Sequence, residues 1–161
     1  MKKVICHNME KENIEVDASE LSWRPSVYGI LIKDDKILLS RQWDGYDFPG
    51  GGMHIHETME EALIREFWEE TGLKVKVGKV AHAESEFFIP RFHKDKWNCI
   101  LVYFFCEYVS GELSKDNVDE FEKEYMEIAE WVSVDDVDKI RFYNGIDSPA
   151  LIRKVMKSIT N

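Results

Sequence analysis

The clearest periodic pattern in the chain runs from Thr58 to Gly72 and predicts an α-helix. Leu63 and Phe67 recur at helical spacing, and Thr58 followed three residues later by Glu61 is typical of a capping box. Gly72 suits the left-handed conformation that ends many helices. Both ends of this helix are therefore predicted from local signals.

The acidic and apolar residues of this predicted helix are expected on different sides. Three acids, Glu66, Glu69 and Glu70, fall within an arc of roughly 100° on a helical projection. The bulky apolar side chains fall on the other side: Leu63, Ile64, Phe67 and Trp68. The helix is expected to bury the apolar side and to present three carboxylates together.

Alternating and β-branched segments predict strands before and after this helix. Residues Val4 to Val16 predict a hairpin that turns around Lys11 to Asn13. A second hairpin is expected from two apolar runs, Ser26 to Ile32 and Lys36 to Arg41, joined by a polar turn. Three further strands are expected downstream: Lys74 to Val80, Asn98 to Val109 and Ala129 to Val134.

Breaker and capping residues predict the remaining loops and helices. One proline and three glycines within Asp47 to Gly52 favour a loop in which backbone segments approach closely. A short helix is expected to start at Val134 to Asp136, and Ser148 and Pro149 predict the cap and first position of another. The apolar positions of that last helix indicate core packing or the interface of a homodimer: Leu151, Ile152, Val155, Met156 and Ile159.

The composition fits a single domain that covers residues 1–161. A chain of 161 residues with 44% hydrophobic and 12% aromatic residues can form a sizeable core, which argues against a disordered protein. Periodicity alone predicts only a mixture of helices and strands.

Charge and segment lengths narrow the range of partners. A formal net charge of −10 argues against a nucleic acid polymer as partner, because such binding normally needs a basic surface. It leaves open a small nucleotide held through a metal ion. The chain has no apolar run suited to a signal peptide or a membrane span, so we expect no membrane partner and a cytoplasmic location.

The three cysteines show no metal-binding spacing. Cys99 and Cys106 would point to opposite faces of one strand, and Cys6 lies far from both in the sequence. They are interpreted as core or neutral surface thiols.

The three helix carboxylates suggest a cation site. Adjacent carboxylates near a protein surface repel by roughly 1 to 4 kcal/mol per close pair. Mg²⁺ prefers oxygen ligands and commonly binds through a few carboxylates together with substrate phosphates. The alternative is a solvated acidic face, which is common on glutamate-rich helices.

The stretch from Gly51 to Leu73, GGMHIHETMEEALIREFWEETGL, contains a longer pattern than the helix acids alone. Its defined positions are Gly51, Glu57, Arg65, Glu66, Phe67, Glu69, Glu70, Gly72 and Leu73. This stretch resembles the complete Nudix box of the Nudix hydrolase family, which includes MutT-like proteins. Aromatic Phe67 stands where an aliphatic residue is commoner.

The resemblance implies an α/β fold, the Nudix-type α/β/α sandwich with a mixed β-sheet. It also implies a hydrolase of nucleoside diphosphates linked to another moiety, with Mg²⁺ or Mn²⁺ as cofactor. The substrate is then a small nucleotide such as an ordinary or oxidised nucleoside triphosphate, ADP-ribose or a nucleotide sugar. Two other classes stay open: a non-catalytic nucleotide-binding regulator on this fold, and an enzyme like the isoprenoid diphosphate isomerases.

Carried over by position, the resemblance also implies roles for single residues. The metal ligands would be Glu66, Glu69 and Glu70, and the Gly51 carbonyl is a candidate for a further ligand. Arg65 would pair with Glu57 and hold the loop against the helix.

The general base is expected either in the box or in a later loop. Glu66 is the first candidate. Glu124 and Glu127 are the candidates from the acidic segment downstream, with a solvated charged segment as the alternative.

Substrate contacts are expected from arginines and from an aromatic segment. Arg24 and Arg41 are candidate phosphate contacts because a guanidinium offers a planar fork of donors, and a surface ion pair is the alternative for each. Within residues 86–97, Arg91 is a candidate phosphate contact and Phe88 a candidate to stack on a base. The other aromatic candidates there are Phe87, Phe92 and Trp97. The alternative is a β-hairpin whose aromatic residues complete the core.

His54 and His56 flank Ile55 in the glycine loop. They are either ligands of a transition metal or ordinary loop residues, and the neighbouring carboxylates favour the second interpretation.

Overall fold

The helix predicted from the sequence spans Met59–Thr71 and is labelled α1. The structure is a computed structural model that describes residues 1–91 and 94–160. Thr58 and Glu61 exchange the two hydrogen bonds of a capping box, and Gly72 ends the helix with a φ of 77°. Both predicted ends are confirmed, so the positions of the acids on this helix are set by its two caps.

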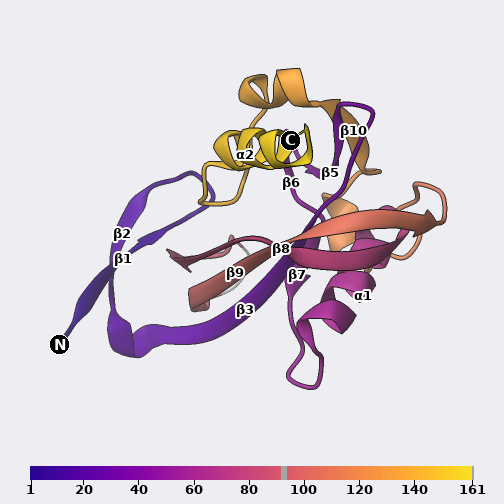
Figure 1. Cartoon of the computed structure of the whole chain (residues 1–161). Helices are drawn as coiled ribbons and strands as arrows, with labels where there is room; N and C mark the ends of the chain where they lie inside the picture. The colour runs from indigo at the N-terminus through magenta and orange to yellow at the C-terminus, as the bar shows by residue number, and fades with distance from the viewer. Residues whose placement is uncertain (92–93, 161) are drawn as a thin grey trace.

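A six-stranded mixed sheet forms the centre of the molecule (Figure 1). Its strands, in spatial order, are β2 (Asn13–Asp17), β1 (Lys3–His7), β8 (Lys74–Phe88), β9 (Lys96–Ser110), β3 (Leu21–Ile30) and β7 (Gly50–Gly52). β1 and β2 form the predicted hairpin, and β8 and β9 form a longer antiparallel pair. β3 runs parallel to β9, which makes the sheet mixed as expected.

A smaller sheet contains β10 (Glu130–Ser133), β5 (Lys36–Gln42) and β4 (Ile32–Lys33), and β6 (Gly45–Asp47) pairs with the far end of β5. The hairpin predicted over residues 26–32 and 36–41 is confirmed at its turn, where β4 pairs with β5, but residues 26–30 belong to β3 and pair in the large sheet instead. β3 already lies between β9 and β7 in the large sheet, so it has no free edge for β5.

The glycine segment is also more regular than the sequence predicts. Gly50 to Gly52 form strand β7, which pairs with residues 26–28 of β3, so the loop expected over residues 47–52 is wrong for this part. A Cβ built at Gly50 would lie 2.1 Å from the Val27 carbonyl oxygen. The glycine permits this close backbone approach, and the partner strand that makes it regular is invisible in the local sequence.

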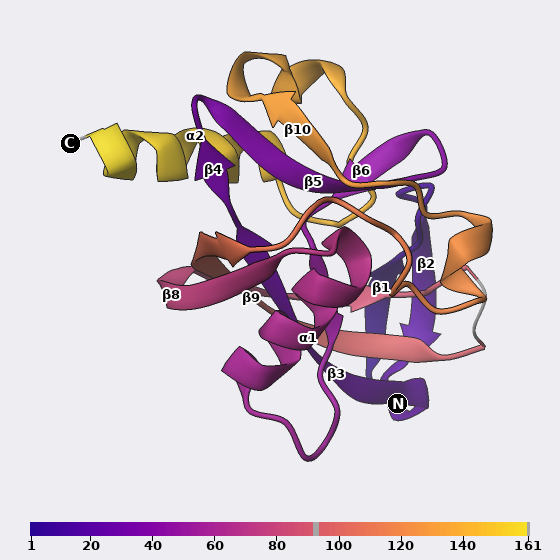
Figure 2. The same ribbon diagram turned by 90° about the vertical axis from the view of Figure 1, so that its right-hand side faces the viewer.

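Two apolar clusters lie on opposite sides of the strands. Leu63 and Phe67 of α1 pack with Val27 and Leu38 in one, and Ile152 of α2 (Ser148–Thr160) packs with Tyr103 in the other. Figure 2 shows α1 and α2 on opposite sides of the strands. This is the α/β/α sandwich that the resemblance to the Nudix family implied.

The cysteines follow the same division. Cys99 belongs to the cluster beside α2 and Cys106 to the cluster beside α1, so the prediction of opposite faces is confirmed. All three cysteines are buried free thiols.

The C-terminal part contains the predicted elements with two differences. The short helix after β10 is a 3₁₀ helix, Val134–Lys139. Asp147, rather than Ser148, caps α2: its Oδ1 accepts from the Ala150 N–H at 3.0 Å, while the Ser148 hydroxyl donates to Asn144. The serine hydroxyl is therefore used inside the fold instead of at the helix end.

Of the helices in the described ranges, none combines the length and the apolar character needed to cross a membrane. The cytoplasmic location and the homodimer stay predictions.

Candidate active site

α1 turns two of its acids, Glu66 and Glu70, toward the sheet. Its buried residues are Ala62, Leu63, Phe67 and Thr71, whereas Ile64 and Trp68 are 37% and 41% exposed. The expected separation of acids from apolar residues is therefore wrong in part. Glu66 precedes buried Phe67 and Glu70 precedes buried Thr71, and both acids are half-buried between α1 and the strands.

Glu70 is held by the strands that α1 covers. Its Oε2 accepts a hydrogen bond from the Ser40 hydroxyl at 2.6 Å and another from the Gly50 N–H at 3.2 Å. Burial raises the pKa of Glu70 well above its ordinary value, and the charge of Glu66 raises it further. No local pattern predicts the contact of Ser40 with Glu70, because it depends on how β5 lies against α1.

Arg65 connects four groups of the box. Its Nε and Nη2 donate to the two oxygens of Glu57 at 2.5 and 2.9 Å, which is the pairing expected from the sequence. Its Nη1 donates to Glu66 at 2.8 Å and Glu69 at 3.2 Å, and Nη2 also reaches the Gly52 carbonyl. The Arg65 guanidinium lowers the pKa of Glu57 to about 2. This network fixes the loop, and Glu57 with it, against the start of α1.

Glu66 lies directly beside the glycine strand. A Cβ built at Gly51 would lie 2.9 Å from Glu66 Oε2, so a side chain at this position would displace the carboxylate. Burial raises the pKa of Glu66, although Arg65 opposes that effect. The carboxylates and the Gly51 carbonyl supply only oxygen donors, which suit a hard divalent cation such as Mg²⁺ or Mn²⁺.

The downstream acid that faces this region is Glu122. It begins a 3₁₀ turn, Glu122–Glu124, and burial together with the charges of Asp119, Glu66 and Glu69 raises its pKa to about 7. Of the two acids predicted from this segment, Glu124 is exposed, and Glu127 pairs with Lys115 at 3.2 Å. Several acids occur close together here, and only the turn decides which of them faces α1.

A cavity of about 240 Å³ lies next to these acids. Three of the predicted substrate contacts, Arg24, Phe88 and Arg91, line it together with Glu122. The fourth, Arg41, instead forms an exposed ion pair with Glu130 at 2.6 Å. Phe92 lies outside the described residues.

Arg24 lies between the cavity and the carboxylates. Its Cζ lies 4.1 Å from the centre of the Trp97 ring, and its guanidinium is the nearest group to a Cβ built at Gly52. Its charge lowers the pKa of both Glu66 and Glu122 against the effect of burial. Arg24 therefore brings a positive charge to the place where the cavity meets the carboxylates.

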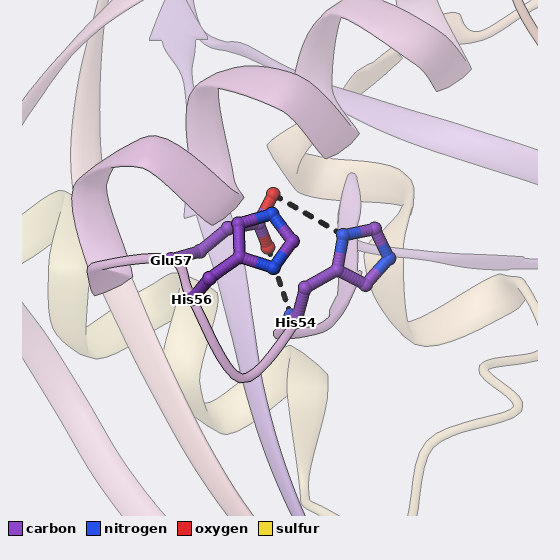
Figure 3. Close-up of side chains that lie close together, drawn as sticks. All are labelled: His54, His56 and Glu57. Carbon is purple, nitrogen blue, oxygen red and sulfur yellow. Dashed lines mark hydrogen bonds and ion pairs between the residues drawn. The ribbon is translucent and has the colours of Figure 1, made fainter.

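The two histidines of the glycine loop lie beside Glu57 (Figure 3). Potential ligand atoms of His54, His56 and Glu57 lie within 4.8 Å of one another. However, Glu57 accepts from the His54 N–H at 2.8 Å and both of its oxygens bind Arg65. These contacts favour a role in ordering the loop.

A scan against family models matches the NUDIX domain over residues 22–152. Among curated proteins, the chain is 36% identical over 112 residues to an ADP-ribose pyrophosphatase from Methanocaldococcus jannaschii, covering 64% of this chain and 61% of that protein. It is 38% identical over 58 residues to a MutT-like protein from Streptomyces ambofaciens, covering 34% and 38%. An RNA pyrophosphohydrolase from Xylella fastidiosa is 48% identical over 54 residues, covering 32% and 28%. The matches thus span less than two thirds of each relative's length.

Solved structures share the fold at low sequence identity. An ADP-ribose pyrophosphatase from Streptococcus suis superposes with a TM-score of 0.64 and 18% identity, covering 86% of this chain and 92% of that one. A MutT protein from Methanosarcina mazei gives a TM-score of 0.62 and 21% identity, covering 88% and 99%. Since the family model covers most of the chain, including the whole box and the cavity-lining strands, this protein belongs to the NUDIX domain family.

Proposed function

We propose that this protein is a metal-dependent hydrolase that cleaves the diphosphate of a nucleoside diphosphate linked to another moiety. One observation supports the proposal: Glu66, Glu69 and Glu70 are all present on α1, Arg65 binds the first two, and a cavity lined by Arg24, aromatic rings and Glu122 lies beside them. A non-catalytic regulator or an isomerase gains no support from a site in which every acid of the hydrolase pattern is present.

Glu66, Glu69, Glu70 and the Gly51 carbonyl are the residues that would hold Mg²⁺ or Mn²⁺. The fit rests on their chemistry: all donors are oxygens, and the Glu66 and Glu70 carboxylates repel each other in a buried place. When bound, such a cation neutralises charge on the diphosphate and makes water more acidic.

The protein's own residues then position and deprotonate the attacking water. The water oxygen forms a bond to one phosphorus, its proton passes to a carboxylate, and the bridging P–O bond breaks to release two phosphate products. Glu66 is the first candidate for the proton acceptor, and Glu122 faces the same region from the opposite loop. Arg65 fixes Glu66, and Arg24 supplies positive charge for the phosphates.

The formal net charge of −10 favours a small nucleotide over a nucleic acid polymer as the substrate. The relatives include proteins named for ADP-ribose and for RNA, but a net charge of −10 disfavours a long polyanion. The cavity is smaller than the roughly 300 to 1,000 Å³ usual for whole drug-sized ligands, so it suits one part of a nucleotide.

The proposal is tested by mass spectrometry of products released from a pool of nucleoside diphosphate derivatives. The expected result is cleavage with Mg²⁺ or Mn²⁺ and none with EDTA, and the consumed compound identifies the substrate class. If folded protein cleaves no member of the pool with either metal, the hydrolase assignment is contradicted.

A further inference from the structure

Glu122 lies in a long segment that has little regular structure of its own. Residues 111–129, all of which the structure describes, connect β9 to β10, and their one helical element is the 3₁₀ turn Glu122–Glu124. A turn of three residues makes too few internal hydrogen bonds to be stable by itself. The place of the Glu122 carboxylate therefore depends on contacts with other parts of the chain.

The end of β5 supplies such contacts through its backbone. The Trp43 N–H donates to the Tyr125 carbonyl at 3.0 Å, and the Glu127 N–H donates to the Arg41 carbonyl at 3.0 Å. The residues between these two bonds form an antiparallel bridge. The chain that follows the Glu122 turn is thus paired with the end of β5.

The side chain of Trp43 extends this connection toward Glu122. Its ring stacks on that of Tyr125, with 4.4 Å between the ring centres and 14° between the planes. Two further groups contact the Trp43 ring: Tyr143 meets it edge-on at 5.4 Å, and Arg91 lies 5.3 Å from its centre. The Tyr125 N–H in turn donates to the Glu122 carbonyl at 3.1 Å. Trp43 is therefore linked to Glu122 through one residue.

The backbone of Trp43 is strained. Its φ is 45°, in the left-handed region, and it is the first residue of the two-residue turn that joins β5 to β6. Glycine, asparagine or aspartate commonly takes such a position because a bulky side chain makes it unfavourable. The ring contacts of Trp43 offset this cost, and strain of this kind occurs often at functional sites.

We propose that Trp43 is a positioning residue, whose ring fixes Tyr125 and through it holds Glu122 toward the carboxylates of α1. This inference rests on the proposed function, in which Glu122 takes part in hydrolysis. The step concerned is the transfer of the water proton to the Glu122 carboxylate while the new P–O bond forms and the bridging P–O bond breaks. In this role Trp43 acts on turnover through Glu122.

Kinetics of three tryptophan variants test the role in turnover, with the nucleotide that the product assay identifies as substrate. Trp43→Leu removes the flat ring, Trp43→Phe keeps an aromatic ring, and Trp23→Leu changes a tryptophan that is 71% exposed on β3. We expect Trp43→Leu to lower kcat about 10-fold with little change in KM, and the other two variants to stay within about threefold of native kcat. Because the two residues act together, adding Trp43→Leu to Glu122→Gln should lower kcat no further.

Hydrogen exchange tests the positioning itself without any hydrolysis. Exchange of the backbone amides of residues 119–127 is measured in the native protein and in the same three variants, in the absence of nucleotide. Exchange there is expected to be faster in Trp43→Leu and close to native in Trp43→Phe and Trp23→Leu. Exchange in α1 is expected to be native in all of them, which shows that the variants are folded.

The two measurements separate the possible outcomes. Native exchange of residues 119–127 in Trp43→Leu, native turnover in Glu122→Gln, or losses in kcat that add fully in the double variant would overturn the inference. So would a higher KM at native kcat, which would mean that the Trp43 ring contacts the nucleotide. If the native protein hydrolyses no nucleotide, the proposed function fails, and the exchange result still decides whether Trp43 holds the Glu122 turn.

Discussion

Glu70 shows how the surroundings, rather than the residue type, create a site. The same carboxylate on an exposed helix face would be ordinary. Here α1 brings it against β5 and β7, where Ser40 and the Gly50 N–H bind one of its oxygens and burial raises its pKa. A charged group held in such a place costs stability unless a ligand compensates it, which is typical of a functional residue.

The structure places Glu122 at the candidate site, whereas the sequence analysis named Glu124 and Glu127 as candidate bases from this segment. Glu122→Gln is expected to lower turnover about 10- to 100-fold if it takes part in proton transfer at the diphosphate. Glu124→Gln, which changes an exposed acid two residues away, is expected to leave turnover close to native. Steady-state rates at saturating metal check this pair. A loss in Glu124→Gln with normal rates in Glu122→Gln would restore the sequence-based assignment.

Glu86 is expected to make stability depend on pH. Burial raises its pKa from 4.5 to about 7, so the folded state holds its proton more tightly than the unfolded chain. The stability that this gives is complete below about pH 4.5 and is lost as the pH rises through about 7. The difference between a pKa of 4.5 and one of about 7 corresponds to about 3 kcal/mol.

Glu86→Gln cannot ionise and therefore keeps that stability at high pH. The difference in melting temperature, variant minus native protein, should therefore be larger at about pH 8 than at about pH 4. Thermal unfolding at both pH values measures the difference. An offset that is the same at both would mean that the Glu86 carboxyl is not destabilised by burial.

Among the secondary-structure elements, α1 was the easiest to predict and the easiest to place wrongly. Its limits at Thr58 and Gly72 depend on caps that lie within the helix sequence itself, and they are confirmed. Its orientation depends on the strands that it covers, so Ile64 and Trp68 are exposed while Glu66 and Glu70 face inward. β7 was not predicted because it also depends on a distant segment: the glycine run forms a strand only when it pairs with β3.

Gly72 is required for the end of α1. Its φ of 77° is unfavourable for other residues, and a Cβ would lie 2.4 Å from the Glu112 carbonyl oxygen. Gly72→Ala should therefore lower the free energy of unfolding by at least about 1 to 2 kcal/mol, measured by chemical denaturation. Gly78→Ala, whose Cβ would lie 3.1 Å from its nearest neighbour, should cost less. Equal effects would show that the left-handed end of α1 has no special importance.

In the whole molecule, Arg24 lies between two parts of the candidate site, the carboxylates of α1 and the cavity. The cation-binding acids come from one continuous stretch, and for that reason the sequence revealed them through a single motif. The cavity is assembled from β3, β6, β8, β9 and the segment around Glu122, and no local pattern joins these residues. Asp47, Glu86 and Glu122 therefore became visible only when the fold brought them together, whereas the sandwich itself followed from the family resemblance.

The most direct test of the central claim compares two glutamates of α1. Glu69→Gln changes a predicted cation ligand that contacts Arg65, and Glu60→Gln changes an exposed acid in the first turn of the same helix. Release of nucleotide product is measured for both variants and the native protein at saturating Mg²⁺, with melting temperatures to confirm folding. We predict that Glu69→Gln loses about 100-fold or more in turnover while Glu60→Gln stays near native. Native turnover in folded Glu69→Gln would contradict the assignment of these carboxylates to a catalytic metal site.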